Sequence, residues 1–187
     1  EASADGPTVV PEIMIPLVSA RREVELVKTR IDAVAAAVKN DQGVDFTYRL
    51  GVMVETPRAA LRAEDIASHA AFLSFGTNDL TQMAYGLSRD DAGRFMSSYV
   101  KLGVYPEDPF HTLDIEGVGE LLKIGAQRGR QARPDIVLSL CGEHGGSPEA
   151  IEFCRDAGFD YVSCSPFRVP VARLAAAQIA LAARLGK

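Results

Sequence analysis

The chain has 187 residues, of which 47% are hydrophobic and 24% are charged, and its formal net charge is −5 at pH 7. This composition is that of one ordinary globular domain, long enough to bury a sizeable core. The negative charge argues against a sequence-independent nucleic-acid binder, and no uninterrupted apolar run approaches the roughly 20 residues of a membrane span. We therefore expect neither a nucleic-acid partner nor a membrane partner.

The opening residues are small and polar and contain Gly and Pro, so we expect a linker or frayed end over 1–10 and a single domain over 11–187. The apolar run 9–18 predicts a first strand, although Pro16 argues against continuous pairing near its end. Ser19 is expected to cap a helix that continues to about Lys39. Its apolar stripe is predicted to belong to the core and consists of Val24, Leu26, Val27, Ile31 and Val34.

Four further apolar runs predict strands, which begin at Gly51, Phe72, Ile136 and Tyr161. Helical patterns separate these runs, and the long interval 81–134 has room for two or three helices. Five strands that alternate with helices indicate a parallel α/β sheet. A closed eight-stranded barrel typically needs about 250 residues. The sheet is therefore either open or most of a barrel that lacks its beginning, and an incomplete barrel leaves unpaired strand edges.

The helix starts carry recognisable capping residues. Thr56 followed by Pro57 and Ser147 followed by Pro148 are each typical of an N-cap and the first helical position. The first pair is expected to open a helix that covers 58–70. Further expected N-caps, in the interval before the fourth strand, are Asp90 or Asp91 and Asp114.

Two of the predicted strands end in a carboxylate. Asp79 follows the turn that begins at Gly76, and Glu55 directly follows the strand that begins at Gly51. In a parallel sheet equivalent strand ends lie on one rim, so Glu55 and Asp79 are predicted to meet there. Two carboxylates completed by substrate oxygens and water suit Mg²⁺. The alternative for Asp79 is a capped turn with a solvated side chain.

The loop after the fourth strand carries the third chemical group. Cys141 is followed by Gly142, Glu143 and His144, and a thiol in such a loop can serve as a general acid or a nucleophile. A free thiol has a pKa of about 8.5, so near neutral pH it is better placed to donate a proton than to attack. The alternative is a buried structural cysteine, which we expect for Cys154.

The three cysteines, Cys141, Cys154 and Cys164, are odd in number and have no paired metal spacing. They favour free thiols in a reducing compartment, and the chain shows no secretory signal pattern. We expect a cytoplasmic location, and an organelle signal on a preceding segment stays open because the chain begins with Glu1 and not Met.

Several of these stretches together resemble the phosphoenolpyruvate-utilising enzymes. The resemblance rests on residues 55–60 (ETPRAA), 75–82 (FGTNDLTQ) and 141–143 (CGE). Residues 88–92 (SRDDA) and 143–146 (EHGG) are similar to the dikinase branch of this family in particular. That branch interconverts ATP, phosphate and pyruvate with AMP, diphosphate and phosphoenolpyruvate.

The resemblance implies a C-terminal portion of the family's pyruvate- and phosphoenolpyruvate-binding (β/α)8 barrel of the TIM type, from about its fourth strand to its eighth. It implies that Glu55 and Asp79 ligate Mg²⁺, and that Cys141 protonates C3 of enolpyruvate. His144, Tyr161 and Ser163 match residues grouped around that cysteine. The substrate-binding positions that it implies are Glu55, Gly76, Thr77, Asn78 and Asp79.

The resemblance also implies partners outside this chain. The family's ATP-binding domain, its phosphohistidine domain and the first three barrel strands with their anion-binding arginines are not in the sequence, so we do not expect the isolated chain to complete the reaction. A homodimer is implied, because the barrel is the family's dimer contact. Two alternatives remain: a stand-alone lyase or aldolase that uses Mg²⁺ and an enolate on the same barrel, and a non-catalytic dimerisation module.

Overall fold

The computed structural model describes residues 6 and 9–185, so most of the expected linker over 1–10 lies outside the described residues. Five strands form one sheet with the order β1-β2-β3-β4-β5, and every neighbouring pair is parallel. The strands are β1 (Glu12–Ile15), β2 (Arg49–Val54), β3 (Phe72–Gly76), β4 (Val137–Cys141) and β5 (Tyr161–Ser163).

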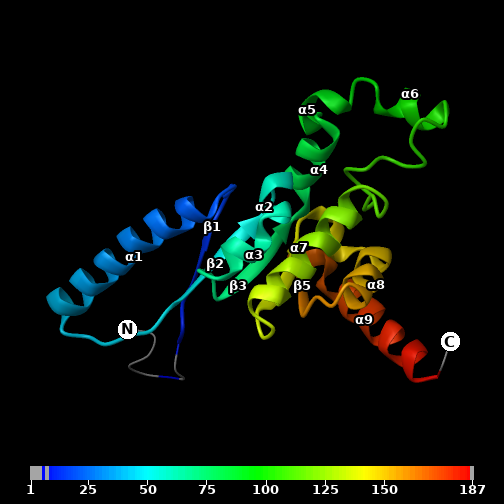
Figure 1. Ribbon diagram of the computed structural model, residues 1–187. Coiled ribbons are helices and arrows are strands. Elements are labelled where there is room, and N and C mark those ends of the chain that lie inside the picture. Colours follow the sequence, from blue (N-terminus) through cyan, green and yellow to red (C-terminus); the bar gives the residue numbers. More distant parts are fainter. Residues whose placement is uncertain (1–5, 7–8, 186–187) are drawn as a thin grey trace.

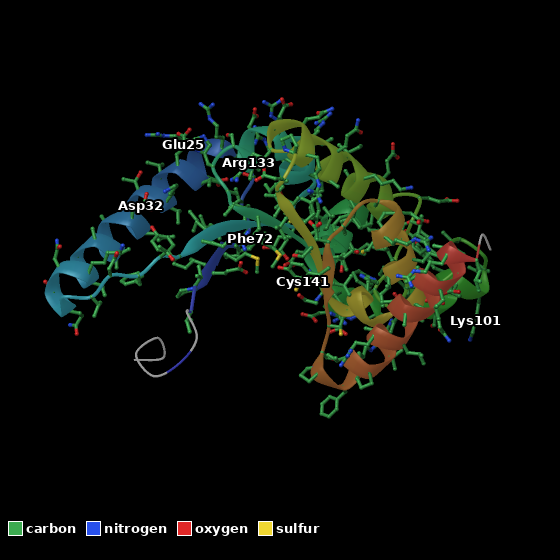
Figure 2. The ribbon with its side chains drawn as sticks, turned by 90° about the horizontal axis from the view of Figure 1, so that it is seen from below. Glu25, Asp32, Phe72, Lys101, Arg133 and Cys141 are labelled. Atoms are coloured by element: carbon green, nitrogen blue, oxygen red, sulfur yellow. The ribbon has the colours of Figure 1, made fainter. Side chains whose placement is uncertain are left out.

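The consecutive strand order decides between an open sheet and a barrel. A doubly wound sheet reverses its strand order at a switch point and carries helices on both faces. Here the order never reverses, and right-handed crossovers then place all connecting helices on one face. Figure 1 shows the helices on one side of the sheet, and Figure 2 shows the sheet curved, with Glu25, Asp32 and Arg133 on the convex side and Phe72 and Cys141 on the concave side. The fold is a partial β/α barrel.

The helices follow the alternation that the sequence predicts, with different boundaries. The helices of the convex layer are α1 (Arg21–Gln42), α2 (Pro57–Leu61), α3 (Ala63–Ala67), α7 (Val118–Ala132), α8 (Pro148–Asp156) and α9 (Val169–Arg184). Those at the carboxyl ends of the strands are α4 (Thr77–Tyr85), α5 (Arg89–Ala92), α6 (Met96–Lys101), η1 (Glu143–Gly146) and η2 (Pro166–Arg168). Among the described residues, no helix has both the length and the apolar character needed to cross a bilayer.

The main core lies between the sheet and the convex helices. Alternate strand residues such as Val52, Leu73 and Leu138 are fully buried there, together with Ile66 of α3 and Leu122 of α7. The intervening strand residues face the concave side, as the two-residue period of a strand requires. A separate small cluster at Ala92, Met96 and Phe110 holds together the α5–α6 lobe, which stands away from the sheet in Figure 1.

The first strand and the first helix differ from the prediction. The strand ends at Ile15, just before Pro16, rather than reaching residue 18. Ala20, not Ser19, is the N-cap of α1, and the Glu23 carboxylate accepts hydrogen bonds from the backbone N–H groups of both residues at 2.7 Å.

The predicted core stripe of α1 is only partly correct. Val24 is fully buried, and Val27 and Ile31 pack against the core, but Leu26 and Val34 are 51% and 63% exposed. The physical reason is that α1 lies at the edge of the sheet, where only one side of the helix meets a neighbour (Figure 1).

Other boundaries also shift. The helix expected over 58–70 is broken at Arg62 into α2 and α3. Asp90 and Asp91 lie inside α5, whose N-cap is Ser88, so neither aspartate is a cap. Gly117, not Asp114, is the N-cap of α7, but the Asp114 carboxylate accepts the backbone N–H groups of Gly117 and Val118 at that helix start, each at 3.1 Å.

Candidate active site

The site residues meet at the carboxyl ends of the strands, where barrel enzymes keep their chemistry. Gly76, Cys141 and Ser163 are register partners at the ends of β3, β4 and β5. Glu55 directly follows β2, and Thr56 caps α2 by accepting the Ala59 N–H at 3.0 Å, as predicted. Strand, acid and cap therefore position the Glu55 side chain at the rim.

Glu55 is a buried carboxylate, only 7% exposed. Its Oε1 accepts the backbone N–H of Leu17 at 2.7 Å, and a Cβ placed on Gly76 would lie 2.7 Å from its Oε2. Burial raises the pKa of Glu55, and the neighbouring Asp79 carboxylate raises that pKa further, while the Leu17 N–H opposes both effects. The two strand-end acids are thus close enough to repel each other.

Asp79 lies in the first turn of α4 and is held from the far side. Gln82 Nε2 donates to its Oδ1 at 3.0 Å, and Gln82 Oε1 in turn accepts the backbone N–H of Arg89 at 2.8 Å. Asp79 is thus oriented and faces the buried carboxylate of Glu55. A hard cation would accept oxygens from both groups and neutralise their negative charges.

The residues present fit a Mg²⁺ ion with few protein ligands. Within residues 6 and 9–185 there is no cluster of three or more His, Cys, Asp or Glu side chains that could hold a metal. Mg²⁺ commonly takes one or two carboxylates and completes its shell with water and substrate oxygens. Glu55 and Asp79 match this requirement, and their mutual repulsion is what a cation would relieve.

Cys141 is half-buried at the end of β4. Burial raises the pKa of its thiol, and the nearby Glu55 carboxylate raises it further. The thiol therefore stays protonated near neutral pH. The chain turns sharply after it, because Gly142 has φ 131° and a Cβ there would lie 2.4 Å from Thr77 Oγ1. The geometry favours a proton donor over a nucleophile.

His144 lies behind the site rather than in its opening. It is 1% exposed, and both ring nitrogens have partners: Nδ1 is 2.8 Å from Thr77 Oγ1 and Nε2 is 3.0 Å from the carbonyl oxygen of Pro109. A carbonyl only accepts, so Nε2 carries the hydrogen. In the neutral ring Nδ1 then accepts from the Thr77 hydroxyl, which also lies 3.2 Å from the carbonyl oxygen of Cys141. Burial lowers the pKa of His144. The ring is neutral and ties the site to the α5–α6 lobe.

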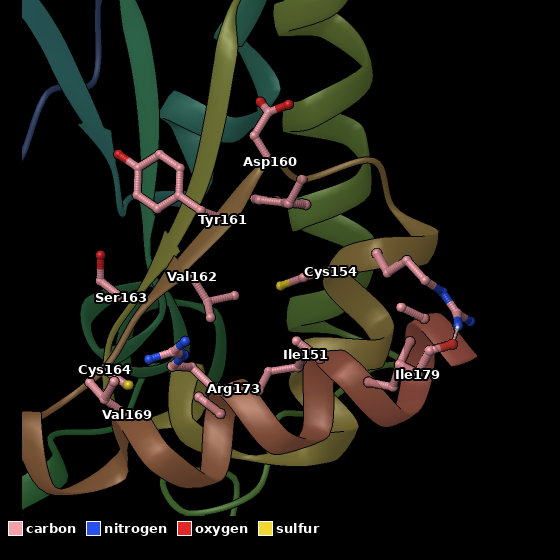
Figure 3. A pocket seen from close by; sticks show the side chains of 15 residues that line it. Ile151, Cys154, Asp160, Tyr161, Val162, Ser163, Cys164, Val169, Arg173 and Ile179 are labelled. Atoms are coloured by element: carbon pink, nitrogen blue, oxygen red, sulfur yellow. Dashed lines mark hydrogen bonds between the residues drawn. The ribbon is translucent and has the colours of Figure 1, made fainter. Parts of the chain in front are cut away.

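Tyr161 and Ser163 project from β5 to the concave side. Figure 3 shows both side chains pointing away from Val162, which projects into the cavity between β5, α8 and α9. Tyr161 is 46% exposed. Asn78, the remaining predicted substrate contact, accepts the backbone N–H of Glu143 at its Oδ1 at 3.2 Å. The structure thus places Glu55, the turn 76–79, Cys141 and Ser163 at the carboxyl ends of β2, β3, β4 and β5, whereas Tyr161 begins β5 opposite Ser139 and His144 lies beneath the rim.

Two positions were not anticipated from the sequence. The Leu17 N–H that holds Glu55 depends on a backbone with φ 50°, rare for a residue other than glycine. The Pro109 carbonyl that holds His144 comes from a loop 35 residues away. Both act through the backbone, which a side-chain pattern does not reveal. Cys154 is buried, as expected, and burial raises its pKa to about 12.

The fold and the site together define a β/α-barrel domain whose acids and thiol converge at the carboxyl ends of its strands. The chain belongs to the family described as PEP-utilising enzyme, PEP-binding domain, whose family model matches residues 1–181.

Three curated relatives carry the name pyruvate, phosphate dikinase. The chain is 58% identical over 179 residues to pyruvate, phosphate dikinase of Rhizobium meliloti and 56% identical over 176 residues to that of Clostridium symbiosum. It is 52% identical over 177 residues to pyruvate, phosphate dikinase 1, chloroplastic, of Arabidopsis thaliana. These matches cover 96%, 94% and 95% of this chain but 20%, 20% and 18% of the relatives. The chain therefore spans about a fifth of the length of these relatives.

Solved structures support the fold. A citrate lyase from Burkholderia xenovorans matches 96% of this chain and 56% of its own, with a TM-score of 0.59 and 15% identity. RipC from Yersinia pestis matches 92% of this chain and 68% of its own, with a TM-score of 0.54 and 14% identity. At this level of identity the likeness concerns the fold alone.

Proposed function

We propose that this chain is the phosphoenolpyruvate- and pyruvate-binding portion of a pyruvate, phosphate dikinase. Such an enzyme is a phosphotransferase that interconverts ATP, phosphate and pyruvate with AMP, diphosphate and phosphoenolpyruvate. The observation that carries the proposal is the convergence of Glu55, Asp79 and the protonated Cys141 thiol on one rim. Family membership and the name of the curated relatives support it.

In this proposal Glu55 and Asp79 hold Mg²⁺. When bound, the ion supplies positive charge that stabilises negative charge developing on the substrate. Glu55 is held in place by the Leu17 N–H and Asp79 by Gln82. Two carboxylates that are already oriented lose little conformational freedom when the cation and substrate arrive.

The turn at the start of α4 contacts the substrate. Gly76, Thr77, Asn78 and Asp79 follow β3 directly, so their backbone groups and side chains border the rim between the two acids and Cys141. Thr77 is oriented by His144, and Asn78 is oriented by the Glu143 N–H. These contacts fix the substrate relative to the thiol.

Cys141 acts as the acid. Its S–H donates a proton to C3 of the enolate of pyruvate, which forms the methyl group of pyruvate and leaves a thiolate; in the reverse step the thiolate removes a methyl proton and restores the enolate. Tyr161 and Ser163 stand beside Cys141 on the concave face and complete the polar surroundings of the thiol. His144 belongs to this group through Thr77.

The test is exchange of the pyruvate methyl protons with D2O, followed by NMR with and without Mg²⁺. We expect Mg²⁺-dependent exchange in the native chain and its loss in Cys141→Ala and Asp79→Ala. Cys164→Ala and Asp90→Ala are the matched controls and should retain exchange. Exchange that persists in Cys141→Ala would show that the thiol is not the acid, and exchange independent of Mg²⁺ would oppose the metal site.

The complete reaction needs groups outside this chain. We infer that the ATP-binding and phosphohistidine domains of the parent protein are partners of this portion. ATP consumption that depends on pyruvate should appear only when those domains are supplied. Pyruvate-dependent ATP consumption by the isolated chain would contradict the requirement for those domains.

A homodimer is part of the proposal, and the outer face of α9 supports it. Val171, Leu174, Leu181 and Leu185 recur at helical spacing and are all exposed. We expect sedimentation velocity to detect a dimer that Leu174→Glu weakens, whereas Leu26→Glu, at an equally exposed position on α1, should leave it intact. Equal effects of the two substitutions would show that α9 is not the contact.

A further inference from the structure

A polar cavity lies at the rim, beside Cys141 and away from Glu55 and Asp79. It has a volume of about 220 Å³ and is bordered by the loops that follow β3, β4 and β5. Asn78 contributes from the first loop, Cys141 from the second, and Ser163, Ser165 and Arg168 from the third. Its size suits a small polar ligand rather than a nucleotide.

Of the residues that the structure describes, Arg168 is the one cationic side chain that borders this cavity. Its aliphatic stem crosses the buried Gly146, where an added Cβ would lie 2.4 Å from Arg168 Cδ. The stem of Arg168 thus packs against Gly146, while the residue as a whole is exposed. Among the described residues, the Arg168 guanidinium forms no salt bridge with a carboxylate and donates no hydrogen bond. Its donors are therefore available to a ligand.

The neighbouring side chains are also donors. The Asn78 amide uses its oxygen to accept the Glu143 N–H, which leaves its NH₂ group as a donor. The hydroxyls of Ser163 and Ser165 can each donate one hydrogen bond. An arginine, an amide NH₂ and two hydroxyls together favour a ligand with several acceptor oxygens and a negative charge.

One carboxylate, that of Glu143, also borders the cavity. Its Oε1 lies 4.0 Å from a guanidinium nitrogen of Arg89, and more than half of the side chain is exposed. Arg89 belongs to α5, on the lobe side of the rim. The Glu143 charge is thus drawn toward Arg89 and solvent, and it leaves Arg168 without a counter-ion of its own.

We infer that the cavity at Arg168 binds a small oxyanion, a phosphate or a carboxylate. In many β/α barrels a phosphate site forms from the loops that follow two neighbouring strands near the end of the barrel, and here the cavity is bordered by the loops after the neighbouring strands β4 and β5. The inference goes beyond the proposed function, because neither carboxylate of the metal site borders this cavity. The oxyanion lies on one side of Cys141 and the two acids on the other.

The test is titration of the 187-residue chain with inorganic phosphate in the absence of Mg²⁺, by isothermal titration calorimetry at constant ionic strength. We expect saturable binding that Arg168→Gln weakens by at least about tenfold, the usual effect of losing a charge-assisted contact. Arg173→Gln, which removes an equal charge one turn away on α9, should change the affinity less than about twofold.

Arg168→Lys tests the positive charge of Arg168 apart from the shape of its guanidinium. It also provides a more conservative variant in case Arg168→Gln does not fold. Lysine keeps the charge but loses the planar fork, so its affinity should fall between those of the native chain and Arg168→Gln. No saturable binding by the native chain, or equal weakening by Arg168→Gln and Arg173→Gln, would overturn the inference.

A competition arm identifies the source of the anion. Displacement of phosphate by pyruvate would assign the cavity to a carboxylate of the substrate, whereas simultaneous binding of both would assign it to a free phosphate. Because these measurements need no Mg²⁺, their failure is distinguishable from a failure of the Mg²⁺-dependent exchange on which the proposed function depends.

Discussion

At the scale of single residues, the Glu55 carboxylate lies in surroundings that disfavour its ionised form. The carboxylate is buried beside Asp79, and both circumstances raise its pKa. The Leu17 N–H compensates in part and fixes the orientation of the group. The ionised pair destabilises the folded chain, and in the proposed site a cation relieves that repulsion.

Glu55→Gln therefore separates stability from binding. Glutamine keeps an oxygen for the Leu17 N–H but carries no charge. A carboxyl whose folded pKa is raised lowers stability as the pH rises through that pKa, so the variant should have a higher free energy of unfolding than the native chain at pH 7 without metal. Urea denaturation measures this.

The same substitution should weaken Mg²⁺ binding by at least about tenfold, as measured by titration calorimetry. Glu64→Gln, at an exposed carboxylate on α3, serves as the control and should change neither quantity. A less stable Glu55→Gln chain would show that the carboxylate stabilises the metal-free fold.

The pH dependence of stability that His144 contributes has the opposite sign to that of Glu55. Burial lowers the pKa of His144, so it contributes stability that is fully present above its unfolded pKa of about 6.5 and is lost as the pH falls through its folded pKa. The proton would have to enter a ring whose nitrogens already bond Thr77 and Pro109. We expect His144→Asn to be less stable at pH 8 but to show a flatter loss of stability toward pH 5.

His111→Asn is the matched control, since that side chain is largely exposed and should leave the pH dependence unchanged. Urea denaturation at a series of pH values from 8 to 5 measures both variants. A native chain whose stability does not fall on acidification would contradict the buried neutral ring.

At the scale of elements, the loop after β4 depends on one glycine. Gly142 combines φ 131° with ψ −174°, a region that is essentially confined to glycine. The turn brings Cys141 to the rim and His144 beneath it. No other residue type could make this turn without moving Thr77, which lies at the position a Cβ would need.

Gly142→Ala should lower the free energy of unfolding by about 3 kcal/mol, from backbone strain together with the contact at Thr77. Gly86→Ala should cost only about 1 kcal/mol, because Gly86 has an ordinary left-handed backbone at φ 63° and open space around it. Chemical denaturation measures both. Equal costs would show that the loop relaxes around the new methyl group.

At the scale of the whole molecule, the described sheet has two open edges. β1 and β5 each pair on one side only, and their unpaired backbone groups can accept a further strand. Apolar side chains at the edges, including Ile13, Met14 and Tyr161, are substantially exposed. Isolated, such a sheet associates through its edges.

We expect this chain to show concentration-dependent association beyond the α9 dimer, and Met14→Lys on β1 should reduce it, because an edge lysine opposes strand addition. Lys101→Met, an exposed position on α6 outside the sheet, is the control for a general change in charge. Sedimentation velocity over a range of concentrations measures the effect. Association beyond the dimer that Met14→Lys leaves unchanged would show that the β1 edge is not the contact.

The sequence by itself determined the alternation of strands and helices, the acids that follow β2 and β3, the thiol after β4 and the caps at Thr56 and Ser147. These features follow from local periodicity and from the chemistry of neighbouring residues. For the same reason the five strands appeared close to their observed positions.

Only the tertiary structure decided the strand order, the exposure of Leu26 and Val34, and the partners of Glu55 and His144. Each depends on contacts between residues far apart in the chain: the edge position of α1, the Leu17 N–H 38 residues before Glu55 and the Pro109 carbonyl 35 residues before His144. Local sequence encodes which groups are present, whereas packing decides which of them lose water and meet.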